Sequence, residues 1–174
     1  MSLVGIDFAK MSLRDALDLA VLIEEEARDR YEELGDQLIA HRTPEAAGFF
    51  RKMARVEEIH RKQLYDRRHN EFDNEPSTVN ASMLYDIEAP EYDEVRAFMT
   101  VERALEVALR CEEKAHAFFV EAIRRVKDPS VVALFNELRE EEVEHQALVK
   151  AEMAKLPKVK ERSAADFSDD PIAY

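Results

Sequence analysis

The chain has 174 residues, only 3 glycines and 6 prolines, and a formal net charge of −13 at pH 7. This length fits one domain with its own core, and the scarcity of residues that break helices favours a mostly helical protein. The negative charge argues against a nucleic-acid-binding surface, because phosphate binding needs clustered Lys and Arg.

Cysteine content and hydropathy exclude further classes of protein and indicate the cellular compartment. The single cysteine, Cys111, excludes an internal disulfide and a metal module built on four cysteines, and we expect it to pack as a small hydrophobe. No apolar run approaches the roughly 18–20 residues of a membrane span, and residues 1–7 lack the features of a signal peptide. We therefore expect a cytoplasmic protein without nucleic-acid or membrane partners.

The first predicted unit is a helical hairpin that follows an N-terminal extension, residues 1–11. Ser12 is a good N-cap, and apolar residues at helical spacing continue to about Ala40. Thr43 followed by Pro44 is typical of a second helix start. Because only about three residues connect the two helices, they must be antiparallel neighbours.

A long connection, about residues 66–99, follows this hairpin. It contains Pro76 and Pro90 and lacks a sustained helical pattern, although residues 78–85 could form one short helix. Such a crossover lets a second hairpin start at the far end of the first, as in ferritin-like bundles.

The second hairpin is predicted to start at Thr100, and its second helix at Asp128-Pro129. Residues 157–174 are polar and aperiodic, which favours a flexible C-terminal tail. The prediction is therefore an all-α fold, a ferritin-like four-helix bundle over residues 12–156 made of two antiparallel hairpins joined by a long crossover.

Two Glu-x-x-His motifs are the main functional signal. Glu57 and His60 form the first motif, and Glu142 and His145 form the second. Residues three apart lie on one face of a helix, so each motif presents a carboxylate and an imidazole side by side. Two such helices, with one Glu from each of two more, provide the ligands of di-iron and di-manganese carboxylate sites.

An internal repeat selects the other two carboxylates. The segment around Glu24 is repeated around Glu112, just as the first Glu-x-x-His motif is repeated by the second. Each of the four Glu lies about 12–13 residues, roughly 18–20 Å, from its helix start, so antiparallel packing brings them to one level. Four carboxylates with two neutral histidines would balance two divalent cations, and these donors suit iron or manganese.

Other interpretations stay open for these residues. Glu-x-x-His pairs in Glu-rich helices also occur on exposed, salt-bridged faces. Glu24 and Glu112 have Glu neighbours, so each assignment could shift by one residue. A third pair, Glu113 and His116, lies off the centre of the apolar stripe, and we expect it at the surface or outside the ligand set.

The run from Glu24 to Tyr31, which ends in Ala-Arg-Asp-Arg-Tyr, resembles the first-helix signature of the rubrerythrin family. With the two Glu-x-x-His motifs, the resemblance covers about residues 12–156. It implies two iron ions, or manganese, bridged by Glu57 and Glu142, with Tyr31 just outside the ligands and near Glu24. The implied metal ligands are Glu24, Glu57, His60, Glu112, Glu142 and His145.

Two departures from the family pattern matter. Rubrerythrins usually carry a further carboxylate three residues after the third-helix Glu, where this chain has Ala115. The four cysteines of a rubredoxin module are also missing, so the resemblance implies a separate electron donor protein. A homodimer is implied by the resemblance alone.

The resemblance implies a di-iron oxidoreductase that reacts bound Fe(II) with peroxide or dioxygen, as a peroxide scavenger or a ferroxidase. Two alternatives remain: a non-catalytic iron-binding or storage subunit, and a di-iron oxygenase of an organic substrate. The tail, residues 163–174, is either solvated or a short peptide that docks on a partner or a neighbouring subunit.

Overall fold

The computed structural model describes residues 6–40, 44–80 and 100–157. Within these residues a short 3-10 helix precedes four long α-helices. The elements are η1 (Phe8–Lys10), α1 (Leu13–Ala40), α2 (Pro44–Phe72), α3 (Val101–Arg125) and α4 (Pro129–Met153).

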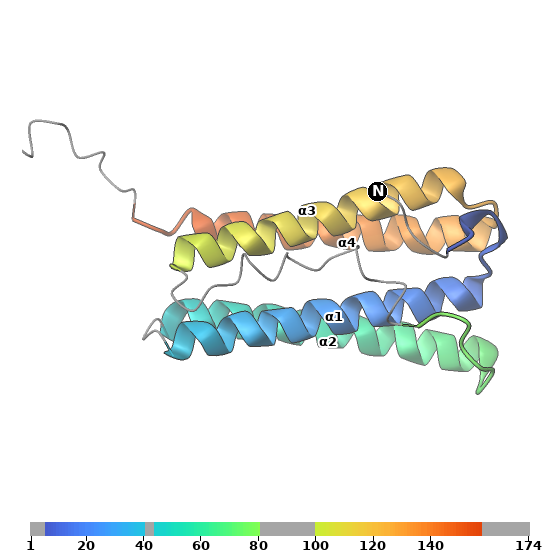
Figure 1. The fold of residues 1–174 in the computed structure, drawn as a ribbon, viewed down its shortest axis with the longest axis horizontal. Coiled ribbons are helices and arrows are strands. Elements are labelled where there is room, and N and C mark those ends of the chain that lie inside the picture. Colours follow the sequence, from blue (N-terminus) through green and yellow to red (C-terminus); the bar gives the residue numbers. More distant parts are fainter. Residues whose placement is uncertain (1–5, 41–43, 81–99, 158–174) are drawn as a thin grey trace, which may run out of the picture.

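The helices form two antiparallel hairpins, α1 with α2 and α3 with α4, that lie against each other (Figure 1). The contacts within each hairpin are far more extensive than those between the hairpins. α2 ends and α3 begins at opposite ends of the bundle, as the predicted crossover requires (Figure 1). The all-α, ferritin-like bundle is therefore confirmed. None of the described helices has the length and apolar character needed to traverse a bilayer.

The structure confirms the four predicted helix starts, and it describes caps for α1, α3 and α4, whereas Thr43 before α2 lies outside the described residues. Ser12 and Asp15 form a reciprocal capping box, in which each backbone N–H donates to the other side chain at 3.2 Å. Thr100 accepts from the backbone N–H of Arg103, and Asp128 accepts from that of Ser130. Each cap satisfies an N–H group that the first turn of a helix leaves without an intrahelical partner.

The end of α2 corrects one predicted boundary. The crossover was expected from about residue 66, but the helix continues to Phe72. Arg68 explains the extension, since its guanidinium donates to Asp18 of α1 at 2.7 Å and to the carbonyl oxygen of Asp73 at 2.6 Å. Asp73 then adopts a positive φ of 47°, which ends the helix.

The remaining predictions for the connections fall largely outside the described residues. Residues 78–80 are not helical, and the rest of the short helix expected over residues 78–85 lies beyond them. The same holds for most of the crossover, and for the C-terminal tail from residue 158 onward.

The apolar core consists of two clusters, one toward each end of the bundle. One contains Leu17 and Ile23 of α1 with Phe119 and Phe135 of the second hairpin. The other contains Tyr31, Leu34 and Phe50 of the first hairpin with Leu105, Ala108 and Val149 of the second. On every helix, the predicted ligands lie between a residue of one cluster and a residue of the other. The fold thus places a polar layer between the two apolar clusters.

Truncation of one large side chain in an apolar cluster tests this core. Phe119 is completely buried, so Phe119→Ala should lower the free energy of unfolding by about 3–5 kcal/mol, measured by chemical denaturation. Ile59→Ala is the control, because Ile59 is 56% exposed and its truncation should change stability by no more than about 0.5 kcal/mol. Equal losses for the two variants would contradict this description of the core.

Candidate metal centre

The structure brings all six predicted ligands to the polar layer between the two apolar clusters. Each helix contributes to this layer, with one Glu on α1, one Glu on α3 and a Glu-x-x-His pair on each of α2 and α4. Five side chains are buried, and the sixth, His60, is half-buried with 21% of its side chain exposed. The buried members are Glu24, Glu57, Glu112, Glu142 and His145.

The half of the cluster around His145 is closed to solvent. His145 Nδ1 lies 3.4 Å from carboxylate oxygens of both Glu57 and Glu112, and 4.0 Å from Glu142. A donor atom from each of Glu112, Glu142 and His145 can be chosen so that all three lie within 4.8 Å of one another. These residues could therefore share one cation.

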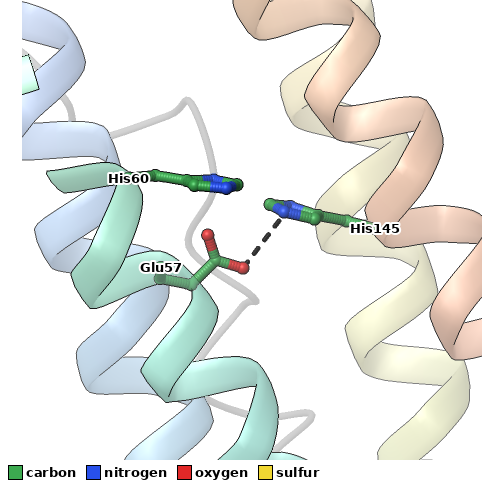
Figure 2. A group of neighbouring side chains, drawn as sticks. All are labelled: Glu57, His60 and His145. Carbon is green, nitrogen blue, oxygen red and sulfur yellow. Dashed lines mark ion pairs between the residues drawn. The ribbon is translucent and has the colours of Figure 1, made fainter. Parts of the chain in front are cut away.

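The half around His60 has a different composition. His60 Nδ1 lies 4.0 Å from Glu24 and 3.9 Å from Glu141, a residue outside the predicted ligand set. The ring of His60 stacks on that of His145, with centroids 5.2 Å apart and planes inclined by 10°. Figure 2 shows the two rings reaching toward each other from α2 and α4, with the carboxylate of Glu57 beside both. Glu57 therefore connects the two halves.

Three residues outside the predicted metal ligands were also considered from the sequence or could have been: Tyr31, Glu141 and His116. Tyr31 was expected near Glu24, but its hydroxyl donates to Glu112 of α3. Glu141 was missed, although it precedes His145 by four residues and could have been noticed on that face of the helix. His116 is half-buried and belongs to none of the groups of described residues that could hold a metal. The structure thus adds Glu112 as a hydrogen-bond partner of Tyr31, while His116 lies outside these groups as expected.

The donor set fits a pair of divalent cations. Four buried carboxylates at one level would be costly unless neutralised, because charge is tolerated in a protein interior only when it is paired or bound to metal. Among the described residues, two buried imidazole nitrogens, Nδ1 of His60 and Nε2 of His145, have no hydrogen-bond partner. Oxygen and imidazole donors without a thiolate suit iron or manganese.

The electrostatics of the cluster differ between its two histidines. Burial disfavours a charged His145, but the hydrogen bond to Glu112 and the charges of Glu57, Glu112 and Glu141 outweigh burial and raise the pKa of His145 to about 9. Burial, with the adjacent charge of His145, lowers the pKa of His60. Burial also raises the pKa of Glu57, against the opposing effects of His145 and Glu24. In the absence of metal, a proton on His145 therefore neutralises part of the carboxylate charge.

This proton predicts how the stability of the metal-free protein depends on pH. The pKa of His145 is raised from 6.5 to about 9 on folding, so its stabilising effect is complete below pH 6.5 and lost as the pH rises through 9. The free energy of unfolding should fall across this window by up to about 1.4 kcal/mol per pH unit.

The measurement is denaturant unfolding of metal-free protein at several pH values. His145→Gln should remove this fall between pH 6.5 and 9. His60→Gln should keep it, because the lowered pKa of His60 leaves that ring neutral throughout the window. If the free energy of unfolding of His145→Gln fell as much as that of the wild-type protein, other groups would be responsible for the pH dependence.

Similar proteins are found both among solved structures and among protein families. The chain is similar to the crystal structure, at 2.00 Å, of an uncharacterized conserved protein from Magnetospirillum magnetotacticum MS-1. The TM-score is 0.71 at 28% sequence identity, and the match covers 86% of this chain and 99% of that one. A search of curated proteins finds no significant match. The family model described as Rubrerythrin matches residues 15–153, which include all six predicted ligands, and the chain therefore belongs to the rubrerythrin family.

Proposed function

We propose that this protein is a di-iron carboxylate oxidoreductase of the rubrerythrin type, which reacts bound Fe(II) with peroxide or dioxygen. The observation that carries the proposal is the group of four buried carboxylates and two histidines between the two apolar clusters. Membership of the rubrerythrin family supports it, because the cluster lies within the matched domain. Manganese is the alternative metal for the same donors.

The contacts suggest how the six residues would divide between two metal ions. His60 with Glu24 would hold one ion, and His145 with Glu112 the other, since each pair lies within 4.0 Å. Glu57 faces both histidines and is placed to bridge the two ions. Glu142, on the opposite hairpin, would be the second bridge.

An iron pair would supply two electrons for reduction of an O–O bond. The chain's own residues would prepare the site for this chemistry. The two apolar clusters exclude water along the bundle axis, which strengthens the interaction of the carboxylates with bound cations. Tyr31 donates to Glu112 and so restricts the orientation of that carboxylate. The partial exposure of His60 leaves the oxidant an approach on its side.

Turnover would require an electron donor. Because the chain contains one cysteine, it cannot form the four-cysteine iron site of a rubredoxin module, and electrons would come from a separate protein. We propose a homodimer as the assembly. A storage subunit would instead form a large assembly with many irons per chain, and size-exclusion chromatography of the iron-loaded protein distinguishes these cases.

Metal content tests the site directly. After anaerobic loading with Fe(II) and removal of excess metal, the protein should hold two irons per chain. Glu57→Ala and Glu142→Ala should each lose at least one iron, since each removes a proposed bridge. Glu140→Ala is the matched control, because its side chain is 75% exposed two residues from Glu142, and it should keep both irons. Less than one iron per wild-type chain would reject the proposal.

The reaction itself is tested by mixing the Fe(II)-loaded protein with each oxidant. Stopped-flow absorbance should show oxidation of both irons by peroxide or by dioxygen, and the faster reaction shows which oxidant the site prefers. Glu140→Ala should react like the wild-type protein. A loaded protein that neither oxidant oxidises faster than free Fe(II) would instead favour the non-catalytic storage subunit.

A further inference from the structure

We propose that Glu141 of α4 is an additional metal-binding carboxylate, specific to the half of the centre around His60. This inference rests on the proposed function, because it adds a seventh donor to the proposed metal pair. It concerns a residue that the Glu-x-x-His pattern does not include, and that reaches the site from the hairpin opposite His60.

The distances place Glu141 as close to His60 as the predicted ligand is. Its carboxylate oxygen lies 3.9 Å from His60 Nδ1, and that of Glu24 lies 4.0 Å from the same nitrogen. Donor atoms of these three residues all lie within 4.8 Å of one another. Side chains from α1, α2 and α4 therefore converge on one point, which a single cation could occupy.

The buried nitrogen of His60 indicates that this point is built for a ligand. His60 Nδ1 is inaccessible to solvent and, among the described residues, has no hydrogen-bond partner. His145, whose ring stacks on His60, is 96% buried, and its Nε2 likewise has no hydrogen-bond partner in the described part of the chain. A cation bound between His60 and the two carboxylates would use a buried nitrogen that is otherwise left unsatisfied.

The two halves of the centre differ in a way that gives Glu141 a role. Glu112 and Glu142 accompany His145 in a closed environment, whereas the half around His60 is partly open. On α3 the position three residues beyond Glu112 is the buried Ala115, which offers no donor, and the following His116 belongs to none of the groups of described residues that could hold a metal. Glu141 is 36% exposed, so its carboxylate can move on or off a cation without unpacking the core. It would complete the open half.

The test uses Co²⁺ as a probe that reports its coordination through visible absorption. Glu141→Gln keeps the size of the side chain and removes its charge. Glu140→Gln makes the same change one residue away, on an exposed side chain 3.5 Å from Arg139. Both variants and the wild-type protein would be titrated with Co²⁺, while thermal unfolding of the metal-free proteins reports their folding.

The wild-type protein and Glu140→Gln should bind two Co²⁺ per chain with the same spectrum. Glu141→Gln should bind one Co²⁺ as before and the other about tenfold more weakly or worse, with an altered absorption band. Its metal-free form should melt at or above the wild-type temperature, because one carboxylate of a crowded acidic site has been neutralised.

Three results would overturn the inference. Unchanged affinities and spectrum in Glu141→Gln would show that Glu141 is not a ligand, while the proposed metal pair would stand. Weaker Co²⁺ binding that accompanies a lower melting temperature of the metal-free variant would assign Glu141 to the fold. A wild-type protein that does not bind two Co²⁺ would remove the proposed function as well.

Discussion

The burial of four carboxylates at the middle of the bundle is the constraint on which the rest of the structure depends. Their side chains are at most 6% exposed. His145, in the same layer, has a raised pKa and so adds positive charge to it. Such a layer is stable only when cations or protons compensate it. The same desolvation that makes the layer costly would make its attraction for two divalent cations strong, because the surrounding dielectric is low.

The apolar core is arranged around this constraint. In many bundles the core is continuous, but here it divides into two clusters with the polar layer between them. Each cluster joins both hairpins, so the hairpins are held together above and below the site rather than through it. The carboxylates consequently face each other across a gap set by packing elsewhere. Removal of a ligand should therefore affect metal binding more than the fold.

The symmetry of the sequence repeat does not extend to the environment of the two histidines. His145 is closed in by three carboxylates, whereas His60 is partly exposed beside Glu24 and Glu141. One metal position would thus be enclosed and the other accessible. In the proposed metal pair, this inequality would let an oxidant approach one side and would make the two ions differ in affinity.

The sequence by itself determined the four helices, their starts and the six side chains that converge. Periodicity and caps are local, and the matched depth of Glu24, Glu57, Glu112 and Glu142 follows from helix rise alone. Local pattern did not reveal the end of α2, because Arg68 extends that helix through contacts with Asp18 and the following turn. Likewise, only the tertiary structure decided which carboxylate Tyr31 contacts and that Glu141 reaches His60. Periodicity defines which face of a helix is inward, but the rotation and spacing of packed helices decide which side chains on that face meet.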